Sequence, residues 1–260
     1  MNKGISFYYG FKSNYKDRAR NIKNAGFDCV ITNADKDFNK QNGSIRNQIK
    51  MFKKYNIKLS SLHMAYKTVE LPNFFKDNKI GKKLEKKLIR DVKIAHKYGF
   101  ICVVVHLCGE PNMIGIERLN RILKVCEKLD TPLAIENLDD KEMITYVFEN
   151  INNKYLKFCY DSGHNNCFDS YFDYLEKYGD KLICLHLHDN MGDEDSHTFN
   201  KYGNIDWEEI AKKLAKCKEV NIDYELLLNV KKNETELETL DICYKQACEL
   251  ESLINKYKEK

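Results

Sequence analysis

The 260-residue sequence has few of the features that mark a domain boundary, a secreted protein or a membrane protein. It has only three prolines, no Pro-, Gly- or Ser-rich linker and no shift in composition, so we expect one domain over residues 1–260. The opening MNKGISFYYGF lacks the long apolar core and small-residue cleavage site of a secretory signal, and no later run approaches membrane-spanning length. These absences predict a soluble, cytoplasmic protein with no membrane partner.

The ten cysteines include no CxxC pair. They are dispersed along the chain, and four of them lie inside apolar runs: Cys29, Cys102, Cys159 and Cys184. In a chain of this size we therefore expect buried thiols in a reducing compartment and not a disulfide scaffold.

Arginine is also scarce, and the net charge is only +4. The basic residues are mostly lysines that alternate with Glu and Asp in helical segments such as GKKLEKKLIRDVKIAHK, as in a solvated helix face. A nucleic-acid footprint is more often clustered and richer in arginine. Charge alone therefore neither supports nor excludes DNA as a partner.

The chain instead contains eight alternations of short β-branched or aromatic runs with longer segments of helical period. The predicted strands are 4–8, 27–31, 57–62, 101–106, 132–136, 156–161, 182–187 and 222–228. The predicted helices are 14–25, 42–55, 79–98, 115–129, 140–151, 168–178, 206–216 and 234–257. Eight such pairs predict an α/β fold, a single (β/α)₈ TIM barrel. A doubly wound sheet is the main alternative, but SFYYGFKSNYKD after the first strand has no GxGxxG.

Metal-binding residue types occur where the predicted strands end. The strand-end residues are His63, His106, Glu136, Asp161 and His186, and His164, Asp195 and His197 follow in the loops. In a TIM barrel the carboxyl ends of all strands form one face, so these residues should converge there. Each of them alone has an ordinary explanation as a hydrogen-bonded or capping residue. Together they predict a shared divalent metal, since neutral His and ionised Asp or Glu are its ligands.

The motifs HMAY, VVVHLCGEP, AIEN, YDSGH, HLHDN and DSH…YGNIDW resemble, in order and spacing, those of the xylose isomerase-like TIM-barrel superfamily. The resemblance extends from about residue 57 to 230. That superfamily contains sugar and sugar-phosphate isomerases and epimerases, and also the endonuclease IV type of apurinic-site endonuclease.

The resemblance to the endonuclease branch implies up to three zinc ions. A first would bind His63 and His106, with Glu136 bridging to a second at Asp161 and His186. A third would bind His164, Asp195 and His197. In the sugar isomerases it implies only the central metal, for which Mn²⁺ or Co²⁺ would also serve, with a further Glu from the last strand.

That last glutamate is where this sequence departs from the family, because its position falls on Asn229. Glu225 has the same strand parity, but four residues place it roughly 13 Å lower at about 3.3 Å per residue. We therefore expect Glu225 in the lower barrel and Asn229 as a weak ligand or substrate contact. His188, two residues after His186, is expected as another substrate contact.

The leading hypothesis is a metal-dependent sugar or sugar-phosphate isomerase or epimerase, with Glu136 as the base that removes a proton next to a carbonyl. With Asn229 on the last strand, a one-base isomerase is favoured over a two-Glu epimerase. The alternatives are a zinc-dependent apurinic-site endonuclease, for which DNA would be the partner, and a barrel that binds a ligand without turnover. The sequence does not indicate an oligomeric state.

Overall fold

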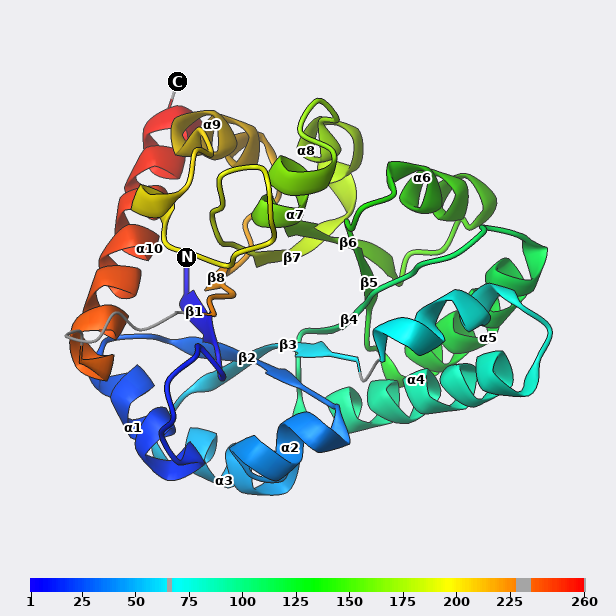
Figure 1. The fold of residues 1–260 in the computed structure, drawn as a ribbon, viewed down its shortest axis with the longest axis horizontal. Helices are drawn as coiled ribbons and strands as arrows, with labels where there is room; N and C mark the ends of the chain where they lie inside the picture. Colours follow the sequence, from blue (N-terminus) through cyan, green and yellow to red (C-terminus); the bar gives the residue numbers. More distant parts are fainter. Residues whose placement is uncertain (65–66, 228–234, 260) are drawn as a thin grey trace.

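The chain forms an eight-stranded parallel barrel surrounded by helices (Figure 1). The computed structural model describes residues 1–64, 67–227 and 235–259. The strands are β1 (Lys3–Ser6), β2 (Cys29–Asn33), β3 (Lys58–His63), β4 (Cys102–Val105), β5 (Leu133–Glu136), β6 (Leu156–Asp161), β7 (Leu182–His186) and β8 (Ile222–Tyr224). Their order is β7-β6-β5-β4-β3-β2-β1-β8, and a parallel bridge between Leu187 and Tyr224 joins the two ends. The predicted (β/α)₈ barrel is confirmed.

Helices follow the strands on the outside of the barrel. They are α1 (Tyr15–Asn24), α2 (Lys36–Asn42), α3 (Ile45–Lys54), α4 (Lys79–Tyr98), α5 (Met113–Leu129), α6 (Lys141–Asn150), α7 (Ser162–Phe168), α8 (Tyr174–Tyr178), α9 (Trp207–Lys216) and α10 (Glu236–Lys258), with 3₁₀ turns η1 (Thr68–Phe75), η2 (Gly179–Lys181) and η3 (Asn200–Tyr202). The sequence prediction missed α2 and α7, which have seven residues each and begin within three residues of the end of β2 and β6. None of the described helices is long and apolar enough to cross a membrane.

Helix α4 illustrates how local sequence sets these elements. Asn78 caps its start, where the side-chain oxygen accepts from the Gly81 amide. Gly99 ends it with φ of 84°, a left-handed conformation that glycine adopts without steric cost. Leu84, Leu88, Val92 and Ala95 recur at helical spacing and are buried against the barrel.

Small side chains fill the barrel interior below the strand ends. Val104, Ala134, Cys159 and Cys184 each lie two residues before a predicted metal ligand and form one buried cluster with Cys102. Side chains two residues apart on a strand point to the same face, so this layer lies directly beneath the ligands. All ten cysteines are free, as predicted. This buried apolar layer therefore closes the barrel beneath the candidate ligands.

The eighth strand is shorter than predicted. It ends at Tyr224, where Ile5 of β1 pairs with it and the Glu225 amide donates to the Leu187 carbonyl at 2.9 Å. The predicted strand ran to residue 228, which would have put the C-terminal edge four residues later. Glu225 is instead the first residue beyond the strand.

Candidate metal centre

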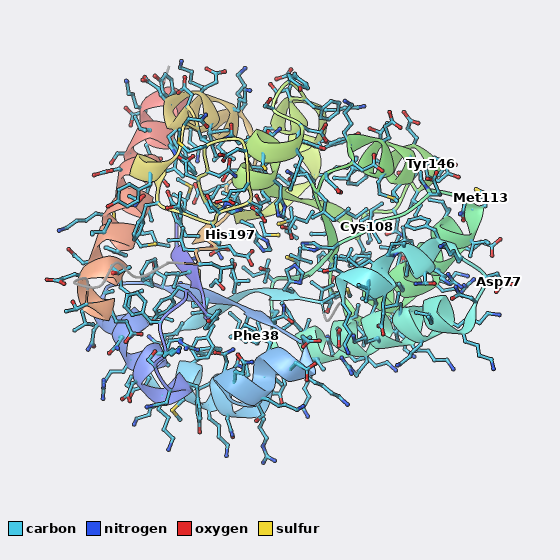
Figure 2. All side chains as sticks on the ribbon, viewed as in Figure 1. Phe38, Asp77, Cys108, Met113, Tyr146 and His197 are labelled. Carbon is cyan, nitrogen blue, oxygen red and sulfur yellow. The ribbon has the colours of Figure 1, made fainter. Side chains whose placement is uncertain are left out.

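The C-terminal strand ends bring together four groups of side chains whose ligand atoms lie within 4.8 Å of one another, and one of these, Cys159 with Glu136 and His186, overlaps the central site defined next. We call the set Glu136, Asp161, His186 and Glu225 the central site, and the set His164, His188, Asp195 and His197 the outer site. The third group is His63 and His106 with Glu136, which it shares with the central site. All eight residues predicted as metal ligands are therefore gathered on one face of the barrel, and His197 is seen over the strands, inside the ring of helices (Figure 2).

The central site is organised around His186, which is fully buried. Its Nδ1 lies 3.1 Å from Glu136 Oε2 and 2.9 Å from Glu225 Oε2. Glu136 stands at the end of β5 and Glu225 just beyond β8, so the two carboxylates approach the imidazole from different strands. The Glu225 side chain is 27% exposed, whereas that of Glu136 is 1% exposed. The central site is thus open on the Glu225 side.

The expectation that Glu225 lies low in the barrel is wrong. It rested on a last strand that continues to residue 228, with the strand-end position at Asn229. Because β8 has only three residues, the C-terminal edge falls at Glu225. Asn229 lies outside the described residues, so its predicted contact with substrate stays a prediction.

His63 and His106 lie beside Glu136. Their Nε2 atoms are 3.1 Å apart, and each approaches Glu136 Oε2, at 3.6 Å from His63 and 3.1 Å from His106. The His63 Nδ1–H donates to the Met64 carbonyl at 3.0 Å, which leaves its Nε2 to face the pair. This is the tautomer that a metal-binding imidazole needs.

The outer site joins the barrel to the long segment after β7. His164 comes from α7 and His188 from just beyond β7, while Asp195 and His197 come from the segment itself. Asp195 Oδ2 lies 3.3 Å from His164 Nε2 and 3.1 Å from His197 Nε2. The Nδ1–H groups of these two histidines donate to the carbonyls of Asn137 and Glu225, at 2.9 and 2.8 Å. Both Nε2 atoms are thereby directed at Asp195.

His188 was predicted as a substrate contact, but its side chain is completely buried. The ring stacks on His197 with centroids 3.8 Å apart and 16° between the planes. A Cβ on Gly163 would come within 1.8 Å of the His188 Cε1, so the glycine makes room for the ring. His188 thus lies among the side chains of the outer site, and its predicted contact with substrate stays a prediction.

The donor atoms of both sites fit a bound cation. Buried polar atoms normally find hydrogen-bond partners. Among the described residues, six of the nine buried side-chain N and O atoms that lack one belong to these two sites: Glu136 Oε2, Asp161 Oδ2, His186 Nδ1, both ring nitrogens of His188, and Asp195 Oδ1. Several of these atoms lie about 3 Å from an oppositely charged group without the alignment of a hydrogen bond. A cation between them would satisfy the whole set at once.

The electrostatics of the protein alone lead to the same conclusion. Burial by itself would raise the pKa of Glu136, but His186 and His106 hold it well below its usual range. Burial would likewise lower the pKa of His164, yet Asp161, Asp195 and Glu136 raise it to about 10. Asp195 and nearby carboxylates raise the pKa of His197 to about 9 against the effect of burial. In the metal-free protein, His164 and His197 therefore carry protons where a divalent cation would bind, and the cation would displace those protons.

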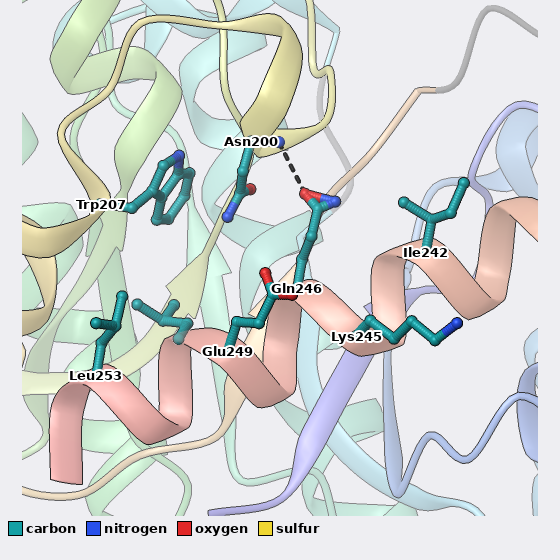
Figure 3. A pocket seen from close by; sticks show the side chains of 8 residues that line it. Asn200, Trp207, Ile242, Lys245, Gln246, Glu249 and Leu253 are labelled. Atoms are coloured by element: carbon teal, nitrogen blue, oxygen red, sulfur yellow. Dashed lines mark hydrogen bonds between the residues drawn. The ribbon is translucent and has the colours of Figure 1, made fainter. Parts of the chain in front are cut away.

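A second set of contacts holds the segment after β7 in place. Trp207, the first residue of α9, donates from Nε1 to Asp189 Oδ2 at 2.6 Å. Trp207 also lines a hollow of about 440 Å³ between α9 and α10, together with Asn200, Gln246 and Leu253 (Figure 3). No residue of the three ligand groups lines this hollow. The candidate ligand residues are therefore gathered at the strand ends and not in this hollow.

Comparison with known proteins gives the family. The model of the xylose isomerase-like TIM barrel family matches residues 19–225. Among curated relatives, the uncharacterized protein y4fM of Sinorhizobium fredii is 32% identical over 97 residues, which are 35% of this chain and 31% of the relative. The chain thus aligns with less than two thirds of that relative's length.

Solved structures resemble the whole chain. A D-tagatose 3-epimerase-like protein is 18% identical with a TM-score of 0.81, covering 98% of this chain and 99% of its own. The IolI protein with a bound zinc atom is 16% identical with a TM-score of 0.75, covering 99% of each. At these identities the likeness shows the fold. Because the family model covers most of the sequence, the chain belongs to the xylose isomerase-like TIM barrel family.

Proposed function

We propose that this chain is a metal-dependent isomerase or epimerase of a sugar or sugar phosphate, with its chemistry at the central site. The observation that carries the proposal is the placement of Glu136 and Glu225 on two sides of His186, at 3.1 and 2.9 Å from its Nδ1. The neighbouring D-tagatose 3-epimerase-like protein and IolI support the same class by fold.

Two ionised carboxylates at one site suit proton transfer next to a carbonyl. His186 keeps the pKa of Glu225 below its usual range although burial acts in the opposite direction, and Glu136 is held low in the same way. One carboxylate can remove a proton from the carbon next to the carbonyl, and the other can return one from the opposite side. The presence of Glu225 therefore favours a two-Glu epimerase over the one-base isomerase expected from the sequence.

A divalent metal held by the central site would supply electrophilic stabilisation of the negative charge that develops on the substrate oxygens. Glu136, Asp161, His186 and Glu225 offer three carboxylates and one imidazole, a set that accepts Zn²⁺, Mn²⁺ or Co²⁺. The buried Asp161 also accepts from the His164 amide at 2.7 Å, which fixes its orientation. The chain's own residues thus orient the ligands and move the proton.

The test is solvent-proton exchange. The metal-loaded protein is incubated in deuterated water with ketoses, aldoses and their phosphates, and deuterium next to the carbonyl is measured by NMR. We expect exchange with at least one sugar, with loss of exchange in Glu136→Gln and not in the matched surface variant Glu117→Gln. Absence of exchange with every sugar, for protein of verified metal content, would contradict the proposal.

A second candidate is hydrolysis of a phosphodiester at an abasic site in DNA. The observation that favours it is the presence of the His63–His106 group and the outer site, which a one-metal isomerase does not need. Closely spaced metal ions can activate water and clamp a phosphate. Cleavage of an abasic-site oligonucleotide that weakens with added salt would support this candidate, and failure of both binding and cleavage would remove it.

A further inference from the structure

The side chain of Asn137 is fully buried beside the central and outer sites and belongs to neither. Asn137 follows Glu136, the last residue of β5, and the adjacent strand β6 ends at Asp161. A carboxamide is neutral but carries one acceptor and two donors, which must find partners when it is buried. The partners of Asn137 therefore show what holds it in this position and what it holds in turn.

Two hydrogen bonds join the Asn137 amide to the backbone of Asp161. Nδ2 donates to the Asp161 carbonyl and Oδ1 accepts from the Asp161 amide, each at 2.8 Å. The last paired residues of β5 and β6 are Glu136 and Cys159. The Asn137 side chain thus extends the ladder beyond the last backbone pair, because a carboxamide offers the same donor and acceptor as a peptide group. It fixes Asp161 at the point where β6 passes directly into α7.

Asp161 in turn contacts residues of both sites. Its carboxylate belongs to the central site, and Oδ1 accepts from the His164 amide at 2.7 Å. The same Oδ1 lies 3.0 Å from His188 Nε2. A shift of the Asp161 backbone would therefore move a candidate ligand of the central site and disturb two residues of the outer site.

Asn137 also contacts the outer site through its own backbone. Its carbonyl accepts from His164 Nδ1 at 2.9 Å, which leaves His164 Nε2 to face Asp195 Oδ2 at 3.3 Å. Metal-binding imidazoles are usually oriented in this way, by a carbonyl or carboxylate at the other ring nitrogen. One buried residue therefore holds the backbone of Asp161 and the ring of His164, which are candidate ligands of different sites.

The two bonds to Asp161 require both polar atoms of the amide. Alanine offers neither atom, and aspartate lacks the donor. With alanine at position 137, the amide and the carbonyl of the buried Asp161 would both lose a partner, which is unfavourable away from water. The Asp161 backbone would then no longer be held at the end of β6.

We infer that Asn137 is a positioning residue that aligns Asp161 of the central site and His164 of the outer site. It acts through these two neighbours and not as a ligand, because its side-chain oxygen and nitrogen are both bonded to the Asp161 backbone. The inference rests on the proposed function only in that the two sites hold divalent metal. It does not depend on which reaction the chain catalyses.

The test compares zinc release from wild type, Asn137→Ala and Asn42→Ala, each full-length and loaded with Zn²⁺ alone. Asn42 is the matched control, because it is also buried and bonds to Arg18 and to the Phe38 carbonyl, on a helix that carries no member of either site. Release is followed with a competing chelator. We expect release from Asn137→Ala at an about ten- to hundredfold lower chelator concentration, the usual effect of losing a residue that orients ligands.

Asn42→Ala should release zinc at the wild-type chelator concentration. Coincident release curves for wild type and Asn137→Ala would overturn the inference. An equal shift in Asn42→Ala would also overturn it, because the zinc would then be lost through lower stability and not through misaligned ligands.

A second measurement needs no metal. The His164 amide donates to the Asp161 carboxylate, so its hydrogen exchange in stripped protein, followed by NMR, reports whether that carboxylate stays aligned. We expect exchange about tenfold faster in Asn137→Ala, since the start of α7 then opens locally, and no change in Asn42→Ala. Unchanged exchange in Asn137→Ala would overturn the inference. If Asn137→Ala fails to fold, Asn137→Ser replaces it, because a hydroxyl can keep one of the two bonds, and both effects should be smaller but of the same sign.

The two measurements separate this inference from the proposed function. Wild-type protein that binds no zinc would contradict the metal dependence of the proposed function, and exchange of the His164 amide would still decide the role of Asn137. Zinc-loaded wild type that exchanges no sugar proton would contradict the proposed reaction, and the comparison of zinc release would still decide the role of Asn137.

Discussion

The central and outer sites share one face of the barrel but differ in ligands and in support. The central site has three carboxylates and one imidazole, all at or just beyond strand ends. The outer site has three imidazoles and one carboxylate, and two of its four ligands come from a loop. With a divalent cation the first would carry one negative charge and the second one positive charge. Oxygen-rich ligands on rigid strands suit a catalytic site, whereas nitrogen-rich ligands that come partly from a loop suit a structural site.

The two sites are also in contact, so the separate role of each can be tested by substitutions at one site. In the central site, Asp161 Oδ1 lies 3.0 Å from His188 Nε2 of the outer site, and Asp161 Oδ2 lies 3.7 Å from His164 Nδ1. The His197 side chain donates to the backbone carbonyl of Glu225. A substitution at one site can therefore disturb the other through shared neighbours.

The largest effect is expected from Glu225→Gln at the central site. It removes one of the two ionised carboxylates, so proton exchange on a responsive sugar should fall about 10²- to 10⁴-fold, the usual contribution of a positioned acid or base. The backbone carbonyl that binds His197 stays in place, so zinc at the outer site should remain. The rate is measured by NMR in deuterated water and compared with Glu117→Gln. An unchanged rate would mean that Glu225 is not part of the reaction.

A smaller effect is expected from Gly163→Ala, which acts first on the outer site through the His188 ring. The new Cβ would meet His188 at 1.8 Å, so the ring must move, and overpacking of this kind costs roughly 1–3 kcal/mol. One zinc should be lost while the central metal stays bound. Urea unfolding gives the free energy, and elemental analysis gives the metal.

Gly99→Ala is the control for Gly163→Ala. Its φ of 84° makes alanine unfavourable by about 1 kcal/mol, but a Cβ there meets no atom within 4 Å. It should therefore cost stability without changing the metal content. Equal metal loss in both variants would argue against a steric effect on His188.

The third prediction concerns pH. The folded-state pKa values of His164 and His197, about 10 and 9, lie above the value near 6.5 of an unfolded chain. Their contribution to the stability of the metal-free protein is therefore complete below about pH 6.5 and is lost as the pH rises through about 9 to 10. Zinc requires the deprotonated rings, so its binding strengthens over the same range.

The difference in melting temperature between zinc-loaded and metal-free protein should accordingly widen from about pH 6 to 9. Thermal unfolding with and without zinc across this range measures it. His197→Asn serves as the matched variant, because it removes one of the two titrating rings and should flatten the trend. Parallel curves for loaded and stripped wild type would contradict the exchange of protons for metal.

The sequence was sufficient for the barrel and for most of its rim. Eight strands and eight candidate ligand residues follow from residues whose position at strand ends or in the loops just after them is visible in the sequence, and they lie on one face as predicted. Glu225 was missed because the length of β8 depends on its pairing with β1 and on the bridge from Leu187, and the apolar run past Glu225 resembles a longer strand. The complete burial of His188 could not be predicted, because parity gives the direction of a side chain, whereas its burial depends on Gly163 and on the loop after β7.

The smallest effect on the outer site is expected from Trp207→Phe, which loosens the far end of the loop that carries Asp195 and His197. It removes the bond from the indole Nε1 to Asp189 Oδ2 and leaves a buried carboxylate oxygen without that donor, at a cost of about 1–3 kcal/mol. Asp195 and His197 lie between Asp189 and Trp207 in the chain, so a cation bound to them should also hold the loop. Cleavage after the exposed Glu194 by a glutamate-specific protease should therefore increase only slightly in zinc-loaded protein but clearly in stripped protein. Equal increases in both states would show that Trp207, and not zinc, is the main anchor of the loop.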